Sequence, residues 1–242
     1  MRRRNWWVTL VASLWAIIFL IPLLGAIYTS MRTDNAISSG PFVWEFDRAW
    51  SHYRNAMGAA GYDFASFFKN SIIIAIGTVF LTVLISFPAS YAIVRLRFGG
   101  PWLLRLALAL RITPAIFFVI PFYKLFTAFE LIDKPIVLIL ADSFINVTLA
   151  ILVFSGAIND LPLEIEEAAS VDGASIWKIL RIIVFPLLGP GLAAVGVLTF
   201  LFSWSDYLFA VVLTSSAATP VTTSALIPPL HRKRVVGSMK RL

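Results

Sequence analysis

The chain has 242 residues, of which 59% are hydrophobic and only 14% are charged, and its mean hydropathy is +0.86. Soluble domains carry about 25% charged residues, so this composition indicates an integral membrane protein. The absence of cysteine and the presence of only two, distant histidines argue against disulfides and against a transition-metal site. The net charge of +7 comes from basic residues at the chain ends and beside apolar runs, which is typical of membrane topology signals rather than of nucleic-acid binding.

The first apolar run, residues 6–28, follows three arginines. A basic start before an apolar core is also the pattern of a signal peptide, but this run is long enough to span a bilayer, and no clear cleavage site follows it. We therefore predict a retained first span with a cytoplasmic N-terminus. The next segment, 29–69, is predicted to be a polar and aromatic extracytoplasmic loop, long enough to fold against the membrane or a partner.

Four further apolar runs follow in the chain. The predicted second, third and fourth spans are residues 70–94, 112–129 and 135–158, with a basic cytoplasmic loop between the second and third. A polar cytoplasmic loop at 159–178 precedes a long apolar run, which we expect to form a short interfacial helix, a turn and a fifth span at 192–213. The sequence thus predicts an all-α integral membrane protein, a polytopic helical bundle with five spans, in one domain covering residues 1–242.

The chain ends in a basic tail, residues 228–242. Five spans from a cytoplasmic N-terminus place this tail outside, against the tendency of basic segments to stay in the cytoplasm. A sixth span before the tail would remove the conflict, but residues 214–242 contain no apolar run of spanning length.

The loop at 159–178 concentrates acidic side chains, which a membrane protein seldom keeps in one short segment without a use. Asp160 can cap a helix that begins near Leu161, and Glu164 would lie near its positive end. Gly173 can end this helix in a left-handed conformation. The product is a short helix parallel to the membrane that suits docking into a groove on a soluble partner. The alternative is an ordinary connecting loop that carries charged residues only because it lies in water.

The spacing of this loop resembles the signature loop of ABC importer permeases. That signature is Glu-Ala-Ala, three residues, Gly, nine residues, Ile, one residue and Leu-Pro. This chain has Glu167-Ala168-Ala169, Gly173, Ile183 and Phe185-Pro186, with phenylalanine in place of the usual leucine. The Asp172-Gly173-Ala174 sequence matches the family's common Asp-Gly-Ala.

Other short sequences resemble the carbohydrate-uptake branch, closest to the maltose-type second permease subunit, over residues 5–227. They are Asn70-Ser71, Tyr91-Ala92 with Arg95-Leu96-Arg97-Phe98, and Trp204-Ser205-Asp206-Tyr207-Leu208-Phe209. The resemblance implies a family fold that normally has six spans, and a loop that serves as the coupling helix in a cleft of a cytoplasmic ATPase. By this resemblance Glu167 would engage basic residues of the ATPase. The residues expected to couple to it are Glu164, Glu166, Glu167, Ala168, Ala169, Asp172, Gly173 and Ala174.

The resemblance also implies the partners. They are a second permease subunit, cytoplasmic ATP-binding subunits and an extracytoplasmic substrate-binding protein, all at the bacterial cytoplasmic membrane. The chain has no Gly-x-x-x-x-Gly-Lys-Ser/Thr sequence, so we expect no cofactor on this chain, with ATP and Mg bound by the partner ATPase.

Polar residues within the expected spans suggest where a substrate would pass. Burying such groups in lipid costs a few kcal/mol each, so they should face the protein interior or a water path. Trp204 and Tyr207 are candidates to stack on sugar rings, and Asn146 and Asp206 to bond hydroxyls. Hydrogen bonding between helices explains the same residues equally simply.

We therefore predict the permease subunit of an ATP-driven importer of a sugar or related carbohydrate, and not an enzyme. An intramembrane enzyme is disfavoured because the expected spans contain neither histidine nor cysteine and only single carboxylates. The alternative that stays open is a truncated, non-transporting scaffold or permease remnant, because the sixth span of the family is not visible in the sequence.

Overall fold

The computed structural model describes residues 6–47, 50–55, 57 and 64–214. Their regular structure is helical, apart from one isolated antiparallel bridge between Arg32 and Phe46. The contacts within the chain form two compact units, Met1–Ala65 and Ser66–Leu242, and the single domain expected over residues 1–242 stays a prediction. Three segments fall outside the described residues. They are the N-terminal arginines, residues 215–227 and the expected basic tail at 228–242.

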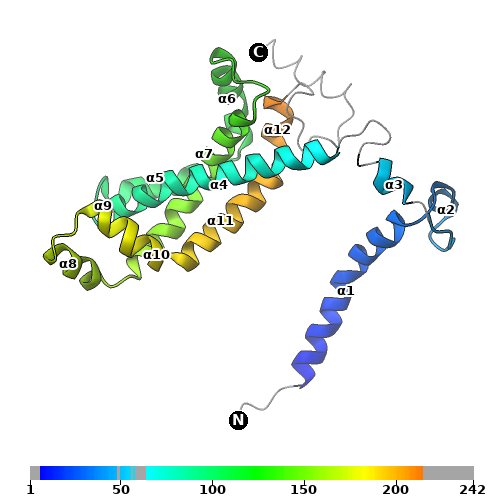
Figure 1. Cartoon of the computed structure of the whole chain (residues 1–242), viewed down its shortest axis with the longest axis horizontal. Coiled ribbons are helices and arrows are strands. Elements are labelled where there is room, and N and C mark those ends of the chain that lie inside the picture. Colours follow the sequence, from blue (N-terminus) through cyan, green and yellow to red (C-terminus); the bar gives the residue numbers. More distant parts are fainter. Residues whose placement is uncertain (1–5, 48–49, 56, 58–63, 215–242) are drawn as a thin grey trace. The chain divides into compact units, whose positions relative to one another are not determined.

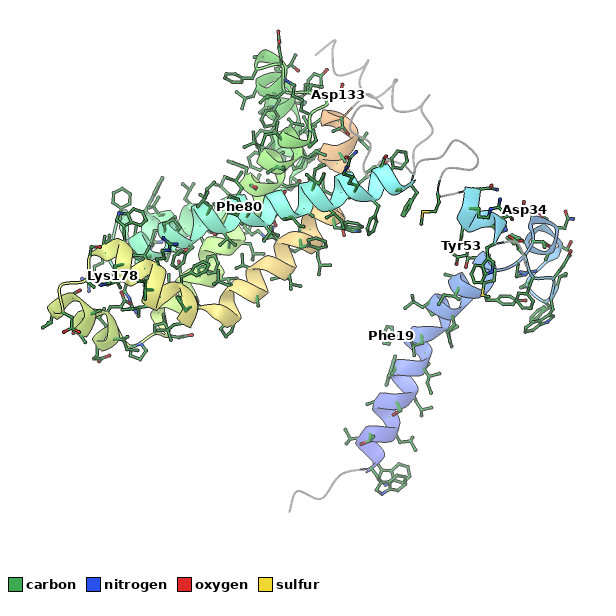
Figure 2. The ribbon with its side chains drawn as sticks, in the orientation of Figure 1. Phe19, Asp34, Tyr53, Phe80, Asp133 and Lys178 are labelled. Atoms are coloured by element: carbon green, nitrogen blue, oxygen red, sulfur yellow. The ribbon has the colours of Figure 1, made fainter. Side chains whose placement is uncertain are left out.

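The N-terminal unit holds a long apolar helix and two short ones. Helix α1 is Trp6–Ser30, α2 is Asp34–Ser39 and α3 is Ser51–Arg54 (Figure 1). None of the residues of α1 is buried, and side chains such as Phe19 project away from the rest of this unit (Figure 2). A 25-residue apolar helix with no buried face is typical of a segment surrounded by lipid.

The second unit is organised around two more helices long enough to cross a membrane, α4 (Phe64–Val94) and α7 (Pro135–Asn159). The buried face of α4 carries small hydroxyl residues at helical spacing: Ser71, Thr78, Thr82, Ser86 and Ser90. Such residues let helix backbones approach closely. At Gly77 an added Cβ would lie 2.6 Å from Cδ1 of Ile139 on α7. Ser143 on α7 in turn donates a hydrogen bond to the Thr78 carbonyl, at 3.4 Å.

The third predicted span, residues 112–129, is not one straight helix. The structure has α5 (Gly100–Ile112) and α6 (Ile116–Ala128), which meet at 97°. Pro114 explains the break, because a residue that precedes proline is driven out of the helical region, and Thr113 is extended. Part of the predicted basic loop is therefore the helix α5, which packs against α7 through Ala107.

The fifth predicted span, residues 192–213, is also interrupted. After the polar loop and its helix α8 (Leu163–Val171), the chain forms α9 (Ile176–Lys178), a π-helical turn η2 (Ile179–Val184) and α10 (Phe185–Leu187). This arm bends by 77° into α11 (Gly189–Trp204). A break at residues 205–207 then separates α11 from the short α12 (Leu208–Leu213). The described residues thus contain three candidate spans, or five if each bent pair crosses once.

Two apolar clusters form the core of the second unit, and both include residues of α7. One joins Val137 and Leu138 to α6 and α12, with Phe126 and Phe209 among its members. The other joins Phe154 and Ile158 to η2 and the start of α11. Between these two parts of α7 lies a polar stretch, Asp142 to Asn146, which holds the buried groups described below.

Candidate functional site

The acidic loop forms the helix α8, at one end of the second unit (Figure 1). Its first turn contains Glu164 and Glu166, which the helix dipole favours there. The predicted cap is wrong, because Asp160 ends α7 and Pro162 precedes α8. Three residues therefore separate the end of α7 from the start of α8, and α8 begins later than the sequence suggested.

Gly173 ends α8 in the predicted left-handed conformation, with φ of +79°. The N–H of Ala174 donates to the carbonyl of Ala169 at 3.0 Å, and the N–H of Gly173 donates to that of Ser170 at 3.0 Å. This pair of bonds is the Schellman arrangement, which satisfies carbonyls that the helix end would leave open. The turn sends the chain back towards η2, so α8 stands at the tip of a hairpin.

The outward side of α8 is acidic at one end and apolar at the other. Glu164, Glu167 and Ala168 are exposed, as are Asp172 and Gly173 beyond the helix. Val171 is 88% exposed, an unusual position for a large apolar side chain. Ala169 and Ala174 instead lie half-buried against the apolar cluster of Phe154 and Ile158. The predicted coupling residues are therefore split between two sides of one short helix.

Glu166 lies on the inward side and is 6% exposed. Its Oε1 accepts a hydrogen bond from Arg95 Nε at 2.8 Å, and its Oε2 accepts one from the Tyr91 hydroxyl at 2.7 Å. Arg95 also donates through Nη2 to the carbonyl of Leu161, at 2.8 Å. Both side chains are largely buried, so the attraction between them offsets part of the cost of removing each charge from water.

These bonds join three segments that are far apart in the sequence. Tyr91 is in the last turn of α4, Arg95 follows that helix, and Leu161 lies in the turn after α7. We call Tyr91, Arg95 and Glu166 the latch. The latch thus connects α8 with the C-terminal end of α4 and with the turn that follows α7. Arg95 belongs to a short family-like sequence, but its partner Glu166 is 71 residues away, so no local pattern indicates the pair.

A second polar group lies in the middle of the helices. Asp142 on α7 is 4% exposed and accepts a hydrogen bond from Ser203 of α11, at 2.6 Å. Ser203 also lies 3.3 Å from the hydroxyl of Thr78 on α4. The amide of Asn146 donates to the Asp142 carbonyl at 2.8 Å. We call Thr78, Asp142 and Ser203 the buried polar cluster; it ties α4, α7 and α11 together.

The residues predicted to line a substrate path are only partly brought together. Asp142, Trp204 and Asp206 border one small cavity, whereas Asn146 and Tyr207 lie outside its lining. Asp206 accepts a hydrogen bond from the Ala210 N–H at 3.1 Å, at the start of α12. The cavity is ≈ 10 Å³, roughly room for one water molecule. In this conformation the cavity is too small for a sugar, and the carboxylates that seemed single share one site.

Metal binding has no support in the part of the chain that the structure describes. There, no group of three or more histidine, cysteine, aspartate or glutamate side chains is placed to hold a metal ion.

Comparison with known proteins identifies a matching family. Residues 82–228 match the family described as binding-protein-dependent transport system inner membrane component. This matched region contains the latch, α8, and Asp142 and Ser203 of the buried polar cluster, whereas Thr78 lies just before it.

Similar proteins of known name include two sugar permeases. The trehalose transport system permease protein SugB of Mycobacterium tuberculosis is 32% identical over 241 residues, covering 98% of this chain and 83% of the relative. The trehalose/maltose transport system permease protein MalG of Thermococcus litoralis is 30% identical over 231 residues, covering 94% of this chain and 83% of that protein.

A solved structure has a similar fold. A chain from the crystal structure of a bacterial ABC transporter involved in the import of the acidic polysaccharide alginate superposes with a TM-score of 0.73. The match covers 93% of this chain and 80% of that chain, at 22% identity. The likeness supports an all-α fold of the ABC importer permease type.

Proposed function

Because the chain belongs to the family of binding-protein-dependent transport system inner membrane components, we propose that it is the permease subunit of an ATP-driven importer of carbohydrate. Its relatives include permeases named for trehalose and for trehalose or maltose. The chain is a multi-pass protein of the cell membrane. We propose further that its N-terminus is cytoplasmic, which places α8 in the cytoplasm.

The observation that carries this proposal is the two-sided character of α8. Its outward side offers Glu164, Glu167 and the 88% exposed Val171. Carboxylates next to an exposed apolar side chain suit a groove with basic residues on its rim and an apolar floor. We propose that a cytoplasmic ATPase subunit supplies this groove and binds ATP and Mg, while this chain binds neither.

The latch supports a mechanical role for the docked helix. When the ATPase moves α8, the buried contact between Glu166 and Arg95 moves the cytoplasmic ends of α4 and α7 with it. Glu166 is therefore proposed to position α8 from within and not to touch the ATPase, in contrast to its place among the expected coupling residues. Glu164, Glu167 and Val171 are proposed to make the contact.

The buried polar cluster is proposed to lie beside the translocation path. The break between α11 and α12 places Trp204 and Asp206 next to Asp142. Because α4, α7 and α11 meet there, tilting them apart would enlarge the small cavity and expose these polar groups to a sugar. The remaining walls of the path belong to a second permease subunit, and the substrate arrives on an extracytoplasmic binding protein.

The test is a charge reversal on the outward side of α8. The chain would be assembled in proteoliposomes with its second permease, ATPase and binding protein. Glu167→Lys should abolish retention of the ATPase and sugar uptake, because it opposes like charges at the docking groove. The subunit itself should still insert and fold, since Glu167 is exposed.

Glu130→Lys is the matched control, because Glu130 is exposed and acidic but lies in the turn between α6 and α7. ATPase retention in this variant should equal that of the parent chain. If Glu167→Lys also retains the ATPase and transports sugar normally, α8 is not the docking element.

A further inference from the structure

Three aromatic rings gather at the C-terminal end of α1. Tyr28 lies in its last turn, and the Trp44 and Phe46 rings stand 5.3 and 6.1 Å from the Tyr28 ring, centre to centre. The Trp44 and Phe46 rings are 6.4 Å apart. We call these residues the aromatic collar. Trp44 is 72% exposed, so the N-terminal unit leaves much of the collar uncovered.

Backbone pairing places the collar beside the helix end. The N–H of Thr33 donates to the Glu45 carbonyl at 3.1 Å, and the N–H of Asp47 donates to the Met31 carbonyl at 2.8 Å. Alternate residues of an extended chain face the same side. Trp44 and Phe46 therefore point the same way, and both rings meet Tyr28.

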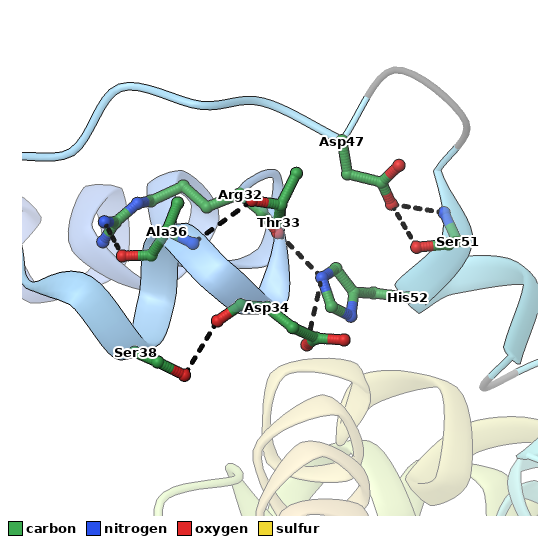
Figure 3. Close-up of polar contacts among 8 residues, drawn as sticks. All are labelled: Arg32, Thr33, Asp34, Ala36, Ser38, Asp47, Ser51 and His52. Carbon is green, nitrogen blue, oxygen red and sulfur yellow. Dashed lines mark hydrogen bonds and ion pairs between the residues drawn. The ribbon is translucent and has the colours of Figure 1, made fainter.

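A buried arginine, Arg32, holds the turn that leads to this pairing, and Figure 3 shows its contact with the Ala36 carbonyl. Arg32 is 3% exposed, and its guanidinium donates to the carbonyls of Val43, Ala36 and Gly40. The guanidinium also lies 5.2 Å from the centre of the Tyr28 ring. A His52 ring nitrogen lies 2.7 Å from the Arg32 carbonyl, which ties α3 to the same point. The collar is thus held in place, not carried on a loose loop.

The length of α1 sets the depth of the collar. The apolar stretch from Trp6 to Tyr28 is about 34 Å long as a helix, compared with about 30 Å for the hydrocarbon core of a bilayer. Trp6 and Trp7 stack at one end, and Tyr28 is at the other. Tyr28 therefore lies where α1 leaves the hydrocarbon, and its two ring partners lie at nearly the same level.

We propose that the aromatic collar lies in the headgroup region of the bilayer and anchors the segment after α1 to the membrane surface. Tryptophan and tyrosine favour this region, because their rings are apolar and their N–H or O–H groups bond to water and headgroups. The collar continues the lipid-facing surface of α1, and Phe42, 84% exposed, extends it. A soluble partner would instead need a surface that projects into water.

The test uses the absence of cysteine in the chain, which makes every introduced cysteine a unique label site. Nitroxide labels would be attached at Phe42→Cys and at Trp44→Cys in the full chain in proteoliposomes. Phe42→Cys leaves all three collar rings in place, so its label measures exposure to lipid even if Trp44→Cys disturbs the fold. Asp34→Cys is the control, because the Asp34 side chain is 91% exposed and charged, and its contact with His52 is long, at 3.9 Å.

The labels at residues 42 and 44 should collide severalfold more often with dissolved oxygen, which enriches in lipid, than with a water-soluble nickel complex. The label at residue 34 should show the reverse. Equal access of the nickel complex to all three labels would overturn the proposal. The proposal would also be overturned if the nickel complex reached the labels at residues 42 and 44 and lost this access only when the binding protein was added. That result would indicate a protein-docking surface. Neither outcome depends on what α8 binds, so the two proposals fail separately.

Discussion

Glu166 and Glu167 are neighbours in the sequence, yet their carboxylates lie in opposite environments. Glu166 is 6% exposed and bonded to Arg95 and Tyr91, whereas Glu167 is exposed to solvent. Successive residues of a helix are turned by about 100°, so Glu166 points into the protein while Glu167 points into solvent. The comparison shows that a charge cluster in a loop is not one functional unit. Substitutions on the inward side of α8 should therefore lower stability, and those on the outward side should weaken ATPase binding.

The largest effect on stability is expected from Glu166→Ala. It leaves the buried Arg95 charge without its carboxylate, which typically costs about 3–5 kcal/mol. The free energy of unfolding, measured in detergent or bicelles, should fall by that amount. The double variant Glu166→Leu with Arg95→Met is the control, because replacing both partners of a buried pair by apolar residues is often neutral. A single variant as stable as the parent chain would contradict the latch.

Tyr91→Phe should have a smaller effect of the same kind. It removes one hydrogen bond to a charged group, which contributes about 1.5–3 kcal/mol. The ring keeps its place in the apolar cluster with Phe154. The unfolding free energy should therefore fall less than for Glu166→Ala, and the loss should vanish in a background that already carries Glu166→Leu. Additive losses would show that the two side chains act independently.

Gly173→Ala should destabilise α8 through its backbone alone. An added Cβ would meet no atom within 4 Å, but φ is +79°, where a side chain costs about 1–2 kcal/mol. Gly156→Ala is the matched control, because Gly156 is equally open but lies inside α7. There alanine should be neutral or stabilise by up to about 1 kcal/mol. Equal unfolding free energies for both variants would argue against the left-handed turn.

Glu167→Lys should change stability least, by no more than about 0.5 kcal/mol, as is usual for an exposed position. The substitution should instead affect assembly of the complex, because the ATPase is expected to be lost. A thermal melt of the isolated subunit, compared with that of the parent chain, checks this. A large drop in stability would mean that Glu167 supports the fold and not the contact.

The sequence predicted some of these features for good physical reasons. Helix α1 and most of α4 and α7 follow from long apolar runs, and Gly173 was identified by the spacing of the signature loop. Hydropathy does not detect bends, so it predicted neither the 97° angle between α5 and α6 nor the break at residues 205–207 within the fifth span. The inward turn of Glu166 depends on Arg95, 71 residues away, and Asp142 and Asp206 meet only after α11 packs against α7. Local sequence patterns do not predict contacts between residues that are so far apart in the chain.

The most direct test of the account is labelling of a single cysteine at Val171, in the native absence of any other cysteine. This position is 88% exposed on the outward side of α8. A maleimide should react quickly with Val171→Cys when the subunit is alone and slowly when the ATPase is bound. An unchanged labelling rate in a complex that transports sugar would contradict docking through α8.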